Sequence, residues 1–392
     1  MKKIFTLLST LLIMVSLVSA QLNTRNLTWD GTERVYLEYV SSIYDPQEPT
    51  QVIFCLHGLG DDMTNFYNIG FNEIVDTANG IVIVPQALDA EVPMLGSVGY
   101  CWNAGVGAVV PMLGEIILNQ DVDDTGFLTA ILDSLENNYN IDTERVYFVG
   151  FSLGGFMCNR MASDISDRIT AIASVSGTYG LYYTPEPFQN IDVIHIHGTA
   201  DETIGYDEGM MVIEGYGEID AGMGAQELVD FWVNYNNCSE VPVYYQYPDT
   251  EADGFTFERY IYMNGDNEST VAHIKVNEGT HTWYYTPAND VDYRNEIWRF
   301  FKNQFLFSTE NESIVANQEV NVYPNPANDF VYFTCAETIS KIEVYNLIGS
   351  KVISKKINTN QVRLNLSELN AGLYIVRIFN GNKVTDRKLT VK

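Results

Sequence analysis

Short apolar runs alternate with helical patterns over the first three quarters of the chain. The runs are nearly continuous and rich in β-branched residues, as in strands that are buried on both faces. They are Val52–Leu56, Ile81–Val84, Val146–Val149, Ala171–Val175 and Val193–Ile196. The helical patterns cover Gly126–Asn138, Leu153–Ser163, Ala225–Tyr235 and Asp292–Gln304. This alternation predicts an α/β fold with a mostly parallel sheet flanked by helices. In such sheets a site forms at the carboxyl ends of the strands.

Both ends of the chain differ from this middle part. Residues 1–20 have a basic start, an apolar run and the small-residue site Val18-Ser19-Ala20, which is typical of a secretory signal peptide. No later stretch is long and apolar enough to be expected to cross a bilayer. The last residues alternate apolar and polar positions between Gly and Asn turns, which predicts a small all-β sandwich.

The charge changes sign along the mature chain. The whole sequence has a net charge of −29. Residues 21–318 hold ten Lys and Arg against 45 Asp and Glu, and residues 319–392 hold ten against six. A change this sharp indicates separate units. We expect a signal peptide at 1–20, an α/β domain at 21–307, a linker at 308–318 and a β domain at 319–392. Because the chain is this acidic, we do not expect it to bind nucleic acid through a basic face.

The motif G-x-S-x-G follows the predicted strand Val146–Val149 and opens the next helix. It reads Gly150-Phe151-Ser152-Leu153-Gly154. Glycines at these positions permit a tight turn that places the serine oxygen at its tip, and the helix N-terminus favours an oxyanion. Ser152 is therefore the expected nucleophile. The alternative is a glycine-rich turn whose serine only caps a helix.

A serine nucleophile needs a base, and the chain has five histidines. His57 follows the strand Val52–Leu56, where an α/β sheet with such a serine forms its oxyanion hole. His195 and His197 lie in or at the end of a predicted strand, and His273 lies in the apolar run 271–276. His281 follows that run on a loop before the final helix. His281 is therefore the expected base.

The base needs a carboxylate to fix its tautomer. Asp201 follows the strand that ends at His197, so the order along the chain is Ser, Asp, His, as in α/β-hydrolases. Glu202 and Asp207 are the weaker alternatives. The backbone amides of Leu59 and Leu153 are expected to form the oxyanion hole.

Several other residues are candidates for binding. Trp102, Trp283 and Tyr284 could form an aromatic surface for a phenolic acid or a sugar, with core packing as the alternative. The acidic run 121–126 has Leu132 where a calcium loop needs a glutamate, so we interpret Asp123 or Asp124 as a helix cap. We expect no metal and no cofactor. The cysteines at 55, 101, 158 and 238 could form disulfides or remain buried thiols.

Residues 21 to about 307 resemble the secreted esterases of the polyhydroxybutyrate depolymerase and feruloyl esterase family, a branch of the α/β-hydrolases. The matching stretches are Asp30-Gly31 with Arg34-Val35-Tyr36, Leu56-His57-Gly58, Tyr100 to Ala104, Val122 to Phe127, Gly150 to Gly155, His197 to Asp201 and Thr280 to Trp283. The resemblance implies that Ser152, Asp201 and His281 are the catalytic residues. Thr280 and Tyr284 stand where the family usually has Gly and Pro.

The last 74 residues closely resemble the C-terminal sorting domain of the bacterial type IX secretion system. The resemblance rests on Val322-Tyr323-Pro324-Asn325-Pro326, on the strand patterns at 342–349 and 364–376, and on Arg387 to Lys392. It implies contact with the secretion machinery and a secreted or cell-surface location. A carbohydrate-binding module is the alternative for this region.

These observations predict a secreted serine carboxylesterase that acts through an acyl-enzyme. The expected substrate is a feruloyl or acetyl ester of plant polysaccharide, and hydroxybutyrate polymers or oligomers are the alternative. A serine peptidase and a non-catalytic binding protein are the alternatives of another class.

Overall fold

The computed structural model describes residues 20–94, 96–110, 114–213, 217–303, 321–323, 325–327, 330–346, 350–367, 369–380 and 383–392. Apart from Ala20, the predicted signal peptide lies outside the described residues, and so does the predicted linker at 308–318. The chain divides into two compact units, Met1–Gln189 and Asn190–Lys392. Among the described helices, none combines the length and the hydropathy that a bilayer-spanning segment needs.

The first unit contains six strands of a mostly parallel sheet in the order β1-β2-β4-β3-β9-β10. Their bounds are β1 Gln21–Trp29, β2 Thr32–Val40, β3 Thr50–Leu56, β4 Gly80–Pro85, β9 Ile141–Phe151 and β10 Ala171–Val175. Strand β3 pairs in parallel with β4 and β9, and β9 pairs in parallel with β10. The edge pair β1–β2 and the pair β2–β4 are antiparallel. Every residue of β3, β4 and β10 is buried, as their apolar composition predicts.

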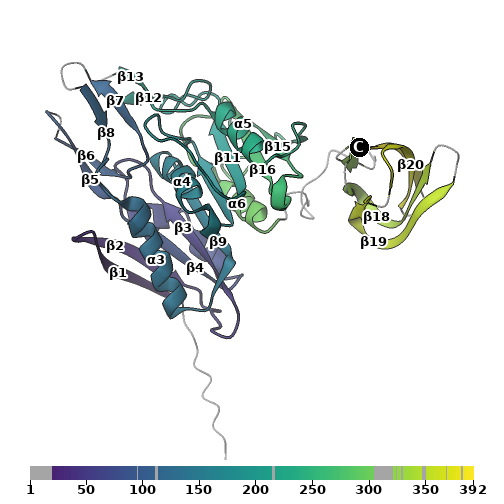
Figure 1. Cartoon of the computed structure of the whole chain (residues 1–392), viewed down its shortest axis with the longest axis horizontal. Helices are drawn as coiled ribbons and strands as arrows, with labels where there is room; N and C mark the ends of the chain where they lie inside the picture. The colour runs from purple at the N-terminus through teal and green to yellow at the C-terminus, as the bar shows by residue number, and fades with distance from the viewer. Residues whose placement is uncertain are drawn as a thin grey trace, which may run out of the picture. The chain divides into compact units, whose positions relative to one another are not determined.

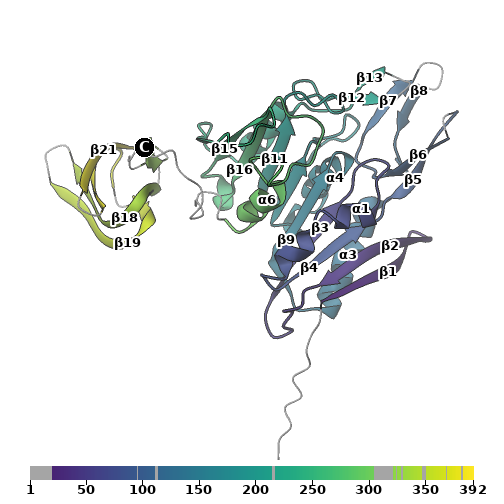
Figure 2. The same ribbon diagram turned by 180° about the vertical axis from the view of Figure 1, so that it is seen from behind.

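Helices cover both faces of these strands. Helix α3 (Asp124–Asn138) and helix α4 (Leu153–Asp164) lie on one face, and α1 (Met63–Tyr67) lies on the other (Figures 1 and 2). Helix α2 (Phe71–Val75) packs on β4. Asp123 caps α3 by accepting a hydrogen bond from the amide of Gly126, so the prediction of a capping aspartate is confirmed. Two hairpins follow β4: β5 (Leu88–Val92) with β6 (Gly96–Cys101), and β7 (Gly107–Val110) with β8 (Gly114–Ile117).

The second unit opens with four strands in the order β11-β16-β15-β14. Strands β11 (Asp192–Gly198) and β16 (Val271–Asn277) are parallel, whereas β15 (Thr256–Tyr262) and β14 (Val243–Gln246) continue antiparallel. Helix α5 (Ala225–Tyr235) packs on β11 and β16, and helix α6 (Tyr293–Phe301) packs on β11. A small hairpin joins β12 (Met210–Ile213) and β13 (Gly217–Asp220). The mostly parallel strands and their helices confirm the predicted α/β-hydrolase fold.

The tail is antiparallel β structure, as predicted. Its strands are β17 (Asn321–Tyr323), β18 (Phe330–Asn346), β19 (Lys351–Asn365), β20 (Gly372–Asn380) and β21 (Lys383–Val391). The long strand β18 pairs with β17, β19 and β20, and β20 pairs with β21 (Figure 1). Alternate residues of these strands form a separate apolar core that includes Val331, Phe333, Val344 and Val376. The tail therefore has its own hydrophobic core.

Candidate active site

The turn between β9 and α4 holds Ser152 in a backbone conformation that non-glycine residues rarely adopt. Its φ is 54° and its ψ is −125°. The amide of Ser152 donates a hydrogen bond of 2.8 Å to the carbonyl of Val175 at the end of β10, which fixes the turn against the neighbouring strand. Such strain persists only where the surrounding structure imposes it, and it concentrates at functional sites. The turn is thus the strand–turn–helix arrangement that the G-x-S-x-G motif predicts.

Two glycines of the motif are required by close backbone contacts. A Cβ atom on Gly150 would clash with the carbonyl of Gly154, and a Cβ on Gly154 would clash with the carbonyls of Leu56 and His57. Helix α4 therefore begins directly against the end of β3. A Cβ on Gly58 would lie 3.3 Å from the Cβ of Ser152, so the loop after β3 runs beside the serine.

The loop after β3 presents a backbone amide next to this serine. Within the described part of the chain, the amides of Leu59 and Leu153 have no hydrogen-bond acceptor. Leu59 is 37% exposed, whereas the side chain of Leu153 is buried. Two amides without acceptors beside a serine have the chemistry of an oxyanion hole.

His57 supports this loop and does not act as a base. Its Nε2 accepts two hydrogen bonds, one from the amide of Ala87 at 3.2 Å and one from Nε2 of Gln86 at 3.0 Å. Its Nδ1 therefore carries the proton and donates to the carbonyl of Gly58 at 2.7 Å. Burial lowers the pKa of His57, which keeps the ring neutral. Gln86 thus fixes the ring that holds the loop, a role that the sequence analysis did not identify.

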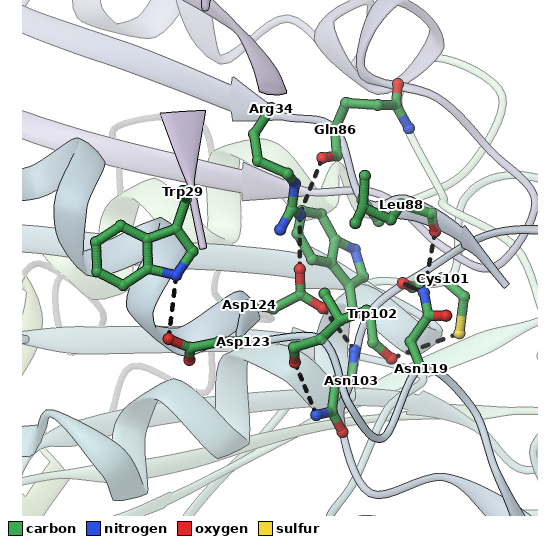
Figure 3. A network of polar contacts seen from close by, with 12 residues as sticks. Trp29, Arg34, Gln86, Leu88, Cys101, Trp102, Asn103, Asn119, Asp123 and Asp124 are labelled. Carbon is green, nitrogen blue, oxygen red and sulfur yellow. Dashed lines mark hydrogen bonds and ion pairs between the residues drawn. The ribbon is translucent and has the colours of Figure 1, made fainter. Parts of the chain in front are cut away.

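Trp102 and Asn103 connect the same loop to a buried ion pair, and Figure 3 shows the contacts of Asn103, Asp124 and Arg34. The indole of Trp102 donates to the carbonyl of His57 at 2.9 Å, and the amide of Asn103 donates to Asp124 at 2.7 Å. Asp124 in turn pairs with Arg34 at 2.6 Å, and Arg34 also donates to the carbonyl of Gln86 at 3.3 Å. Burial raises the pKa of Asp124, although the charge of Arg34 opposes that shift. Two motifs far apart in the sequence therefore meet beneath the loop after β3.

The second unit holds the other two predicted triad residues in direct contact. Nδ1 of His281 lies 2.8 Å from Oδ2 of Asp201. Burial alone would raise the pKa of Asp201, but hydrogen bonds from His197 and His281 outweigh it and hold the pKa well below its ordinary value. The carboxylate is therefore ionised and only accepts, so Nδ1 of His281 carries its proton. The lone pair of the neutral ring is then on Nε2, as a general base requires.

The loops that carry Asp201 and His281 are bonded to each other. The amide of Ala200 donates to the carbonyl of Gly279 at 2.9 Å, and the amide of Glu278 donates to Oγ1 of Thr199 at 2.9 Å. The amides of Thr203 and Ile204 both donate to Oδ1 of Asp201. The acid is thus fixed by its own loop, while Glu202 and Asp207 have no such bonds to His281 among the contacts of the described residues.

The predicted aromatic residues differ in exposure. Trp102 has no exposed surface and Tyr284 is 3% exposed, so both rings have a packing role. The hydroxyl of Tyr284 accepts a hydrogen bond of 2.8 Å from the amide of Thr280, so the two residues that depart from the family pattern contact each other. Trp283 is partly buried and packs on Tyr293. Tyr100, which is 42% exposed, was not predicted as a binding residue.

The four hydrolase cysteines are buried thiols. Cys55, Cys101, Cys158 and Cys238 are not in disulfides, and burial raises the pKa of each thiol. Among the residues described, no group of three or more His, Cys, Asp or Glu side chains is placed to hold a metal ion.

Comparisons with known proteins find a match for each of two segments of the chain. Residues 39–219 match the phospholipase/carboxylesterase family, and residues 321–392 match the secretion system C-terminal sorting domain. The chain therefore contains a segment similar to carboxylesterases and, after it, a segment similar to a secretion sorting domain. The sequence motifs indicated an esterase-like region and a sorting-domain tail, and these two matches confirm both resemblances.

Two curated esterases are similar to more than half of this chain. The bifunctional acetylxylan esterase/xylanase XynS20E of Neocallimastix patriciarum is 25% identical over 274 residues, which are 69% of this chain and 33% of that protein. Feruloyl esterase D of Neurospora crassa is 25% identical over 223 residues, which are 53% of this chain and 62% of that protein. The chain thus spans about a third of the first relative's length.

A solved structure is similar over much of the chain. The acetyl xylan esterase from Aspergillus awamori aligns with a TM-score of 0.49 at 14% identity, and the alignment covers 71% of this chain and 99% of that one.

Proposed function

We propose that this protein is a serine carboxylesterase whose substrates are feruloyl or acetyl esters of plant polysaccharide. The observation that carries the proposal is the strained backbone of Ser152 at a strand–turn–helix junction, beside two amides without acceptors. The contact between His281 and Asp201 supports it, because it gives a base of the correct tautomer. The family of residues 39–219 supports ester hydrolysis, and the names of the two esterase relatives support this substrate class.

In the proposed reaction, Ser152 is the nucleophile and His281 is the general base. Oγ of Ser152 attacks the ester carbonyl while Nε2 of His281 takes its proton. The amides of Leu59 and Leu153 stabilise the oxyanion of the tetrahedral intermediate. The intermediate collapses to an acyl-enzyme, and the alcohol leaves with the proton from His281. Water, activated by His281, then attacks the acyl-enzyme and releases the acid and Ser152. No group other than the substrate and water is consumed.

The tail and the N-terminal segment support an extracellular place of action. Residues 321–392 match a sorting domain of a secretion system, and residues 1–20 have the pattern of a signal peptide. We therefore propose that the enzyme is exported through the type IX machinery and is secreted or attached to the cell surface. Polymeric plant esters would be accessible only there.

A substrate panel tests the proposal. The full chain is assayed with methyl ferulate, acetylated xylan, hydroxybutyrate oligomers and a set of peptides. We expect hydrolysis of the first two, and a fall in kcat of about 10⁴-fold or more for Ser152→Ala. The control is Ser97→Ala, which changes an exposed serine bonded to Asp89. Cleavage of peptides without cleavage of esters would contradict the proposal, as would full activity of Ser152→Ala.

A further inference from the structure

A second imidazole contacts the carboxylate that orients His281. Nε2 of His197, the last but one residue of β11, lies 3.4 Å from Oδ2 of Asp201 and 2.9 Å from the carbonyl of Ile204. Both partners are acceptors when the carboxylate is ionised, so Nε2 of His197 carries a proton and shares it between them. The carbonyl is the nearer acceptor. His197 thus holds both ends of the turn Asp201–Ile204.

The other side of the His197 ring explains why this donor is fixed. Nδ1 of His197 lies 3.2 Å from Nε2 of His195, which is two residues earlier on the same strand. A proton on Nε2 of His197 leaves the lone pair on Nδ1, so His195 donates to it. Both rings have no exposed surface. The partners of both ring nitrogens therefore fix the tautomer of His197, and its N–H points at the turn Asp201–Ile204.

A third histidine and a tyrosine pack around the pair His195 and His197. His273 on β16 stacks on His195 with ring centroids 5.5 Å apart, and burial lowers the pKa of His273 to about 3. The hydroxyl of Tyr206 lies 2.8 Å from Nε2 of His273, and the Tyr206 ring packs edge-on against His197.

Further titratable groups lie in the layers around this histidine cluster. On β16, Lys275 is the register partner of His197, and Glu258 on β15 is the register partner of Lys275. The hydroxyl of Tyr260 on β15 donates to Glu258, and the Tyr260 ring stacks on His273. Tyr293 on α6 is near enough to Asp201 for its own pKa to respond to that charge. Asp201 is therefore the carboxylate in contact with His197 among the described contacts.

We propose that His197 is a positioning residue for the acid of the triad, so that the unit that orients His281 is a His–Asp–His arrangement with His195 behind it. This inference rests on the proposed esterase function. His197 does not touch the substrate or the reacting atoms. It acts through Asp201, by fixing the turn that carries the carboxylate and by taking part of the negative charge away from His281.

Two consequences distinguish this role from simple packing. Without the N–H of His197, Oδ2 of Asp201 is bonded to His281 alone, and more of the negative charge of the carboxylate stabilises the imidazolium form of that base. Activity is lost on the acid side when the base is protonated, so the acid limb of kcat/KM moves to higher pH. The turn also loses one of its two fixed ends, so His281 is less well oriented and kcat falls, while KM changes little.

The test compares substitutions that keep or remove the donor in the full chain. His197→Phe keeps a ring against Tyr206 but has no N–H. His197→Gln places an amide N–H near the position of Nε2 and should restore the function. His273→Phe is the matched control, because it removes an equally buried histidine from the neighbouring strand that has no contact with Asp201. Methyl ferulate is the substrate, and kcat and KM are measured across the pH range.

We expect His197→Phe to lower kcat by about tenfold or more, with KM within about twofold, and to move the acid limb to higher pH. We expect His197→Gln to recover most of both changes, and His273→Phe to lower the unfolding temperature without moving the limb. Should His197→Phe not fold, His197→Asn replaces it, because its shorter amide can face His195 but does not reach Ile204. A donor-free variant with the wild-type acid limb and kcat overturns the inference, as does His197→Gln behaving like His197→Phe.

A readout without substrate separates this inference from the proposed function. The N–H proton between His281 and Asp201 should give a downfield proton resonance, whose titration midpoint is expected to rise in the donor-free variant. A wild-type chain that hydrolyses no ester would reject the proposed function. An unchanged titration midpoint would reject the role of His197, whether or not the chain is active.

Discussion

The imidazole of His281 is oriented through one oxygen atom, Oδ2 of Asp201, at 2.8 Å from its Nδ1. In Asp201→Asn, an amide N–H replaces Oδ2 while the remaining oxygen keeps its bonds to Thr203 and Ile204, so Nδ1 of His281 has to accept and the ring should adopt the wrong tautomer. We expect kcat on ester substrates to fall by about 10⁴-fold. The Oδ1 acceptor for Thr203 and Ile204 is kept, so the fold should remain. Glu202→Gln, which changes the adjacent exposed carboxylate, is the control and should retain activity in the same assay.

The ion pair between Arg34 and Asp124 should contribute strongly to stability because both side chains are buried. Arg34→Met leaves the carboxylate without its charge partner, and breaking a buried pair in this way costs about 3–5 kcal/mol. Chemical denaturation measures this loss. The comparison variant is Arg168→Met, which removes surface pairs to Asp133 and Glu136 and should cost about 1 kcal/mol or less. Equal losses in the two variants would contradict this account of the network.

The carboxyl group of Asp192 should make the free energy of unfolding depend on pH. Burial raises the pKa of this carboxyl to about 7, although the amide of Thr270 donates to it at 2.7 Å. Between the ordinary pKa and this raised value, the unfolded chain is ionised while the folded chain holds the proton. The free energy of unfolding therefore falls as the pH rises through that window, by up to about 4 kcal/mol, and is level above it.

Asp192→Asn removes this titration and keeps the acceptor for Thr270. We expect the variant to be more stable than the wild type at pH 8 and to differ little from it at pH 4, as measured by urea unfolding at both values. A stability difference that does not change between the two pH values would show that Asp192 does not titrate in this window.

Tyr100 is the exposed aromatic side chain beside the loop after β3. Its carbonyl accepts a hydrogen bond from Gly60, one residue beyond Leu59, and its ring lies 6.4 Å from that of His57. An aromatic acyl group held near Ser152 could contact this ring, whereas an acetyl group is too small. We expect Tyr100→Ala to lower kcat/KM for methyl ferulate by about tenfold and for an acetyl ester by less than twofold.

The control for this prediction is Tyr244→Ala, which removes a similarly exposed tyrosine from the edge strand β14. An equal loss on the feruloyl and acetyl esters would mean that Tyr100 supports the loop and does not select the acyl group.

The sequence predicted the strands and helices with strong patterns, and it predicted the contact of His281 with Asp201. The pattern matched β10 and α5 at both ends, because continuous apolar runs and amphipathic periods are local signals. The edge hairpin β1–β2 and the antiparallel strands β14 and β15 were not predicted. The exposed residues of β1 and β14 weaken the apolar signal there, and the antiparallel pairing of β14 and β15 depends on residues distant in the sequence.

The residues that hold the site in place were harder to predict than the residues that would carry out its chemistry. Trp102 and Tyr284 were candidates for binding, yet both are buried, because the depth of an aromatic residue depends on packing that spacing does not reveal. His197 lies four residues before Asp201, and that spacing was visible, but its role depends on which way the turn folds back to Ile204. Gln86 gave no local signal at all, since its partner His57 is 29 residues away.

The buried thiols have a practical consequence for an exported protein. No cross-link among Cys55, Cys101, Cys158 and Cys238 has to form before the hydrolase fold is complete. The maturation of this region would then need no thiol oxidase and no disulfide isomerase, and its activity should be insensitive to dithiothreitol. Such an enzyme could work in oxygen-free surroundings, where electron acceptors for disulfide formation are scarce.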